Sequence, residues 1–214
     1  MELNKYIDHT LLKPDATKDQ IEKLCKEAND YNFSSACMAP CWQHFARPLL
    51  QKSTNLCLVQ NFPHGNNNNV DGISLDWADE IDYVINIGFV KSGLWEALEY
   101  DTKQMRETSS SDTVVKVIVE VGYLTDEELF KTADILIKYN IDFIKTCTGY
   151  GPRNVTVDDI KKIKAHVGDR IRIKASGGIK TRAFAEDLIA SGADRLGTSS
   201  GILIMENKIS GSDY

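Results

Sequence analysis

Ionisable side chains lie inside segments whose other residues are typical of buried strands. In residues 114–121, VVKVIVEV, alternation places Lys116 and Glu120 on one face and the valines on the other. Three further apolar segments carry an ionisable residue on the equivalent face, at Asp82, Lys145 and Lys174. An unprotonated lysine amine can attack a carbonyl and form a Schiff base. The spacing therefore indicates amines and carboxylates that could perform covalent carbonyl chemistry.

The two lysines Lys145 and Lys174 are expected on neighbouring strands. If Lys174 stays cationic, like-charge repulsion and desolvation both favour the neutral, nucleophilic amine of Lys145. Asp82 could relay protons at the carbinolamine and enamine stages, directly or through a water molecule. Periodicity alone also allows a purely structural ion network, formed by Lys116, Glu120, Asp82, Lys145, Lys174 and Arg172.

Glycine-bearing segments follow the late strands. They are TCTGYG (146–151), ASGGIKT (175–181) and GTSSGI (197–202). Glycines let backbone N–H groups approach an anion, serine hydroxyls add donors, and a helix beginning at Thr181 or after Ser200 adds its positive end. These segments predict a phosphate site.

Short β-branched segments alternate with helical periodicity, which is typical of βα units and a parallel sheet. Strands are expected at 6–9, 34–39, 56–62, 81–87, 114–121, 142–147, 170–176 and 194–199. Helices are expected at 17–31, 41–51, 92–108, 125–139, 156–166 and 181–190, whereas 63–79 reads as a loop. Because helices on both faces of an open sheet would bury the charges unpaired, we expect a closed (β/α)8 TIM barrel over residues 1–214, one domain with a polar interior.

Composition excludes several other classes of protein. The net charge of −6 and the absence of a long basic stretch argue against a nucleic-acid partner. Neither a signal peptide nor a run of ~20 apolar residues is present, so we expect a cytoplasmic protein without a membrane partner. Five scattered cysteines and four scattered histidines indicate reduced thiols and no metal site.

Seven segments resemble the deoxyribose-phosphate aldolase family in order and spacing over nearly the whole chain. They are YIDHTLLKPDAT, NFPHG, DEIDYVINIGFVKSG, VKVIVEVGYLTDEE, DFIKTCTGYGP, RIKASGGIKT and GADRLGTSSG. The resemblance implies a class I aldolase that reversibly cleaves 2-deoxy-D-ribose 5-phosphate to D-glyceraldehyde 3-phosphate and acetaldehyde. It also implies a role in deoxyribonucleoside catabolism, no metal or other cofactor, and a homodimer.

The resemblance also assigns roles to residues. Lys145 would be the Schiff-base nucleophile, Lys174 the cation that tunes it, and Asp82 the proton relay. The phosphate would be bound by Gly177, Gly178, Gly197, Ser199 and Ser200. The sugar chain would be positioned by Asp8, Thr10, Thr146 and Thr148, and the terminal Tyr214 could assist proton transfer.

Some positions depart from the family pattern. Ala39 replaces an asparagine of many members, Asn61 replaces a glycine, and the stretch from Gly65 to Asp79 is shortened. Two alternatives therefore stay open. One is a related Schiff-base aldolase acting on another phosphorylated aldehyde, and the other is a sugar-phosphate-binding barrel whose catalysis has decayed.

Overall fold

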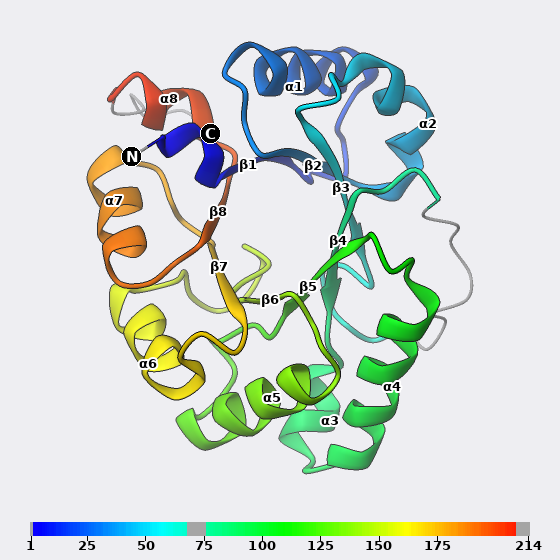
Figure 1. Ribbon diagram of the computed structural model, residues 1–214, viewed down its shortest axis with the longest axis vertical. Coiled ribbons are helices and arrows are strands. Elements are labelled where there is room, and N and C mark those ends of the chain that lie inside the picture. The colour runs from blue at the N-terminus through cyan, green and yellow to red at the C-terminus, as the bar shows by residue number, and fades with distance from the viewer. Residues whose placement is uncertain (1, 68–75, 209–214) are drawn as a thin grey trace.

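The computed structural model describes residues 2–67 and 76–208. Eight parallel strands form a closed barrel in which each strand pairs with its neighbour in the sequence and β8 closes on β1 (Figure 1). The strands are β1 (Ile7–Leu11), β2 (Ser35–Met38), β3 (Asn55–Gln60), β4 (Glu80–Val84), β5 (Val114–Ile118), β6 (Phe143–Lys145), β7 (Arg172–Ser176) and β8 (Arg195–Thr198). The predicted (β/α)8 barrel and its eight strands are confirmed.

Helices surround the strands (Figure 1). They are α1 (Lys18–Asp30), α2 (Gln43–Ala46), α3 (Ile87–Lys91), α4 (Trp95–Thr108), α5 (Asp126–Lys138), α6 (Val157–Val167), α7 (Arg182–Ala190) and α8 (Gly201–Met205). Three 3-10 helices are η1 (Leu3–Tyr6), η2 (Pro40–Trp42) and η3 (Arg47–Leu49). The described residues between β3 and β4, 61–67 and 76–79, contain no helix, in agreement with the loop predicted there.

Side-chain caps fix where the long helices begin. Thr17, Thr125 and Thr156 each accept a hydrogen bond from a backbone N–H of the first turn, in reciprocal capping boxes. Gly168, with a φ of 59°, follows the last residue of α6. These local signals explain why the ends of α5 and α6 match the sequence prediction.

Several predicted elements differ in extent from the structure; the strand expected at 114–121, for example, ends at Ile118. The strand expected at 81–87 ends at Val84, because the Asn86 side chain caps α3 by accepting from the backbone N–H of Phe89. The helix expected at 41–51 is a succession of short turns, since Pro48 lacks a backbone N–H and cannot continue an α-helix.

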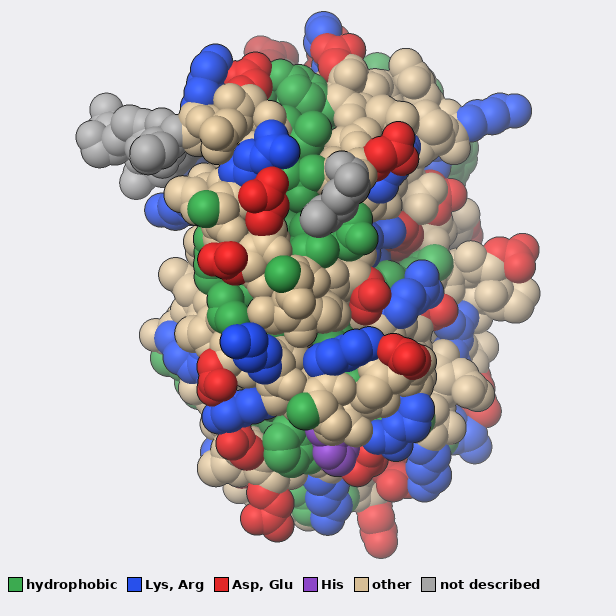
Figure 2. Space-filling model, turned by 60° about the vertical axis from the view of Figure 1, so that its left-hand side comes forward, with side chains coloured by type: hydrophobic (Ala, Val, Ile, Leu, Met, Phe, Trp, Pro, Cys, Tyr) green, Lys and Arg blue, Asp and Glu red, His purple; other side chains and the backbone are tan. Residues whose placement is uncertain are grey.

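Apolar residues pack between the strands and the helices, and ionisable ones lie within the barrel. Val115 and Val117 belong to the hydrophobic core. Lys116, between them in sequence, is on the other face of β5 and is also fully buried. Parallel strands all point to the same mouth, so the loops after them meet there. On the surface in view, basic and acidic side chains are interspersed (Figure 2). None of the described helices combines the length and apolarity that crossing a bilayer requires.

Candidate active site

Asp82 on β4 is the centre of a fully buried group of charges. Its Oδ2 accepts hydrogen bonds from Lys145 Nζ at 2.7 Å and from Lys174 Nζ at 2.6 Å. Lys116 Nζ lies 2.9 Å from the other oxygen, Oδ1. Since two ammonium nitrogens share one oxygen, the structure brings Lys145 and Lys174 together inside the barrel, as the sequence predicts.

Further carboxylates hold two of these lysines. Lys174 Nζ lies 2.5 Å from Asp8 Oδ2, and Lys116 Nζ lies 2.5 Å from Glu80 Oε2. Arg195 on β8 bridges the two acids, at 2.5 Å from Asp8 and 2.8 Å from Glu80. Each of these three cations therefore contacts two carboxylates.

The pKa shifts follow from this pairing. Burial raises the pKa of Asp82, but the ammonium groups of Lys116, Lys145 and Lys174 outweigh burial and hold it well below its usual range. Burial lowers the pKa of Lys174, but the carboxylates of Asp8 and Asp82 outweigh it and raise the value. The pKa of Lys116 is raised in the same way, by Asp82 foremost among its neighbours.

The balance of charge in the cluster singles out Lys145. The cluster contains four basic side chains and three carboxylates, namely Lys116, Lys145, Lys174 and Arg195 with Asp8, Glu80 and Asp82. Among the described residues, Asp82 is the only carboxylate that forms an ion pair with Lys145. Lys145 is therefore held by fewer carboxylates than Lys116, Lys174 or Arg195. It is also the last residue of β6, at the mouth end of the strand, so its amine is the one placed to meet a ligand.

Two thiols adjoin Asp82, which the sequence analysis did not anticipate. Cys37 and Cys57 face each other on β2 and β3, and their sulfur atoms lie with an Asp82 oxygen within 4.8 Å of one another. Cys57 Sγ is 3.2 Å from Asp82 Oδ1, and burial raises the pKa of this thiol well above its usual value. A protonated thiol and a carboxylate already shared by three ammonium groups do not fit a divalent cation.

Two residues proposed for the interior network lie elsewhere. Arg172 is exposed, binds Asp142, and stacks its guanidinium on the Phe143 ring 4.0 Å away, because it begins β7 at the end remote from the mouth. Glu120 lies beyond the end of β5 with a φ of 54° and binds Thr148 instead of a lysine. The positive φ breaks the strand alternation on which the prediction rested.

The glycine segments lie after the late strands. Gly177 and Gly178 follow β7 with φ values of 98° and 75°, conformations that favour glycine. A Cβ at Gly197 on β8 would meet Lys174 Cε at 3.1 Å, so this glycine leaves room for the lysine stem. Ser199 and Ser200 follow β8, and the backbone N–H of Ser200 donates to the Thr198 hydroxyl.

The residues predicted to contact the sugar differ in their surroundings. Asp8 is fully buried in the ion cluster, and the Thr10 hydroxyl donates to the Asp8 carbonyl. The buried Thr146 hydroxyl is bonded to the backbone of Ser176, which ties β6 to β7. Thr148 lies at the mouth, whereas Tyr214 lies outside the described residues.

The altered positions lie near this end of the barrel. Ala39 directly follows β2, and Asn61, with a φ of 58°, follows β3 and donates from its amide to the Val84 carbonyl at 3.0 Å. Of the shortened 65–79 stretch, residues 68–75 lie outside the described part of the chain. The Asp82 cluster is complete without any of these residues.

Sequence reasoning missed Glu80 and Arg195, and it did not anticipate the thiols of Cys37 and Cys57 beside Asp82. The strand expected at 81–87 begins one residue after Glu80. Arg195 lies within the segment GADRLGTSSG, in which the sequence analysis assigns roles only to one glycine and the two serines. The strand alternation that located Asp82 also gives Glu80 the same phase, so a strand boundary one residue earlier would have found it.

The chain is similar to known proteins over nearly its whole length, although no family model matches it. It is 44% identical to a deoxyribose-phosphate aldolase of Carboxydothermus hydrogenoformans, over 97% of this chain and 96% of the relative. A solved structure described as QR15, an aldolase, has a TM-score of 0.88 at 37% identity, covering 95% of this chain and 94% of that one. A deoxyribose phosphate aldolase of Aeropyrum pernix, described as tetrameric, has a TM-score of 0.86 at 29% identity, covering 95% and 89%.

Proposed function

The chain belongs to the deoxyribose-phosphate aldolase family, and from this premise we propose that Lys145 forms a Schiff base with 2-deoxy-D-ribose 5-phosphate. The enzyme is a lyase that cleaves this sugar reversibly to D-glyceraldehyde 3-phosphate and acetaldehyde. The observation that carries the assignment to Lys145 is its shared hydrogen bond with Lys174 on one oxygen of Asp82.

The reaction begins when the neutral Lys145 amine adds to the C1 aldehyde of the open-chain sugar. The carbinolamine loses water and becomes a protonated imine. The C2–C3 bond then breaks, its electron pair moves into the enamine, and the C3 hydroxyl loses its proton as it becomes the carbonyl of glyceraldehyde 3-phosphate. Protonation of the enamine at C2 and hydrolysis release acetaldehyde and return the amine.

Lys174 and Asp82 have complementary parts in these steps. Lys174 stays cationic because two carboxylates hold it, and we propose that this charge, next to Lys145 on the same Asp82 oxygen, tunes the nucleophile. When Lys145 leaves the ion pair to bond carbon, Asp82 loses one of its three cations and becomes more basic. It can then take up and return the protons of the carbinolamine and enamine steps.

In this proposal the phosphate binds at the mouth after β7 and β8, next to β6, which carries Lys145. The loop after β7 supplies Gly177 and Gly178, and the end of β8 supplies Gly197, Ser199 and Ser200. Positive φ values at the first two residues orient backbone N–H groups for an anion. Thr148, Thr146, Thr10 and Asp8 remain the proposed sugar-positioning residues.

Borohydride trapping with substrate, followed by peptide mass spectrometry, tests the Schiff base. We expect the adduct on Lys145 and no adduct in Lys145→Ala. Lys174→Leu should lower turnover at least a hundredfold in a coupled assay for glyceraldehyde 3-phosphate. Lys161→Ala, which removes an exposed lysine, is the matched control and should retain both trapping and turnover. An adduct on another residue would overturn the assignment.

The two alternatives give different results in the same assays. An aldolase for another phosphorylated aldehyde would cleave a different sugar phosphate faster than deoxyribose 5-phosphate. A decayed barrel would be stabilised by phosphate without turnover. The juxtaposed lysines and Asp82 support the active deoxyribose-phosphate aldolase.

Assembly and location complete the proposal. We expect a homodimer in the cytoplasm, whereas the Aeropyrum pernix relative is described as tetrameric. Sedimentation equilibrium of the purified chain distinguishes the two assemblies.

A further inference from the structure

Glu120 carries a buried carboxylate that is only half used. It is 1% exposed, and its Oε2 accepts hydrogen bonds from both the backbone N–H, at 2.9 Å, and the hydroxyl of Thr148. Its Oε1 is buried and has no hydrogen-bond partner among the described residues. Buried carboxylate oxygens are rarely left without a donor, so the missing partner of this oxygen requires an explanation.

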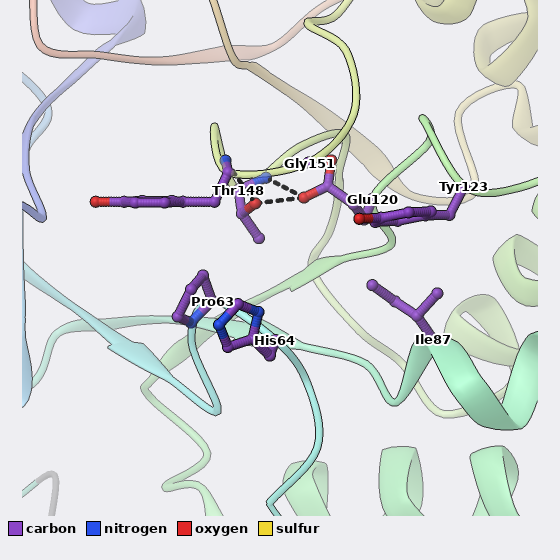
Figure 3. A pocket seen from close by; sticks show the side chains of 8 residues that line it. Pro63, His64, Ile87, Glu120, Tyr123, Thr148 and Gly151 are labelled. Carbon is purple, nitrogen blue, oxygen red and sulfur yellow. Dashed lines mark hydrogen bonds between the residues drawn. The ribbon is translucent and has the colours of Figure 1, made fainter.

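Glu120 is one of the residues that line a cavity of about 210 Å³ at the mouth. Figure 3 shows Thr148, Glu120 and Tyr123 along one wall, with Pro63, His64 and Ile87 facing them. Tyr150 and Gly151 complete the lining, and a Cβ at Gly151 would lie 2.5 Å from Glu120 Oε1. The absence of a side chain at residue 151 therefore lets the carboxylate occupy this position.

The cavity lies nearer the mouth of the barrel than the proposed nucleophile, Lys145. Lys145 pairs with Ile118 of β5, and Glu120 is two residues further toward the mouth on the same chain segment. Thr148 is three residues beyond Lys145. Glu120 and Thr148 therefore lie nearer the mouth than Lys145 along their own chain segments.

Thr148 can only accept from such a molecule. Its single hydroxyl hydrogen is donated to Glu120, and its Oγ1 already accepts from the Tyr150 backbone N–H at 3.0 Å. One lone pair of Thr148 Oγ1 remains. Two acceptors and one negative charge match hydroxyl donors, and they repel a phosphate.

We propose that Glu120, with Thr148, binds the C4 hydroxyl of the substrate and selects acceptor aldehydes that carry a hydroxyl beside the carbonyl. This inference rests on the proposed function. The C3 oxygen becomes a carbonyl on cleavage and then has no hydrogen to donate. The C4 hydroxyl keeps its hydrogen throughout, so an acceptor pair can bind it in substrate and product alike.

The synthetic direction provides a direct test. Acetaldehyde is condensed with D-glyceraldehyde 3-phosphate or with 3-oxopropyl phosphate, which lacks only the hydroxyl, and kcat/KM is measured for each acceptor. Glu120→Gln keeps the shape and an amide oxygen for Thr148, but replaces the unpaired acceptor with an amide donor. We expect the ratio of the two kcat/KM values to fall at least tenfold, as the loss of a hydrogen bond to a charged group implies.

Two further variants and a control complete the experiment. Thr148→Val should lower the ratio in the same direction, and Thr148→Ser, which keeps the hydroxyl, should preserve it. Glu127→Gln makes the same chemical change on the exposed side of α5 and should leave the ratio at the wild-type value.

The outcomes separate this inference from the function on which it rests. A wild-type chain inactive with both acceptors would contradict the proposed aldolase activity. An active wild type whose ratio is unchanged in Glu120→Gln and Thr148→Val would overturn the hydroxyl site alone.

Discussion

Asp82 and Glu120 are both buried carboxylates of the same barrel, but their partners differ. Both oxygens of Asp82 contact ammonium groups, from three lysines. Glu120 uses one oxygen for Thr148 and leaves the other without a donor. Burying a charge is costly unless it is paired. Asp82, with both oxygens paired, therefore stabilises the charged state of its lysine neighbours, whereas Glu120 keeps one oxygen that could accept a further hydrogen bond. The barrel thus separates tuning of the nucleophile from recognition of the ligand.

The largest effect on stability is expected from replacing Asp82, whose two oxygens are both paired. Asp82→Asn removes the anion that three buried ammonium groups share, so the free energy of unfolding should fall by about 3–5 kcal/mol. Turnover should disappear as well, since the proton relay is lost. Urea denaturation at pH 7 measures the stability, and a loss below about 1 kcal/mol would contradict the view that Asp82 holds the cluster together.

The pH dependence of stability should be the next largest effect. The folded pKa values of Asp82 and Glu80 are lowered, so the unfolded chain binds more protons at acid pH. Their stabilisation is present above about pH 5 and is lost as the pH falls below the unfolded values near 4. The raised pKa of Lys174 acts in the opposite sense, so stability should decline again only above about pH 10.

Denaturation between pH 3 and 7 tests the predicted loss of stability at acid pH. The wild type should lose about 2 kcal/mol or more over this range, and the difference between wild type and Asp82→Asn should narrow as the pH falls. A constant difference would show that the Asp82 carboxylate is not the group being titrated.

The sequence predicted the fold well because local signals and tertiary packing agree. Threonine caps mark the starts of α5 and α6, Gly168 marks the end of α6, and alternation marks the strands. The prediction was wrong where side chains at a strand end changed the local structure, as Asn86 does by starting α3. The short turns from Pro40 to Leu49 follow from prolines whose effect on a helical pattern was underestimated.

The site was predicted only in part, for a geometric reason. Alternation within one strand shows which residues face inward, and it located Lys145, Lys174 and Asp82. It does not show the height of each residue along the barrel axis, which depends on the register between strands. Arg172 and Glu120 have inward phase in the sequence but lie near opposite ends of their strands, so neither reaches the cluster.

The smallest effect on stability is expected from Glu120→Gln. The amide oxygen can keep both hydrogen bonds from Thr148, and a buried negative charge with one unpaired oxygen is removed. The free energy of unfolding should therefore stay within about 1 kcal/mol of the wild type, or rise, while selection of the hydroxylated acceptor is lost. The same urea denaturation as for Asp82→Asn measures it, with Glu127→Gln as the exposed control. A loss as large as that of Asp82→Asn would mean that Glu120 serves the fold, because an acid kept for binding should be dispensable for stability.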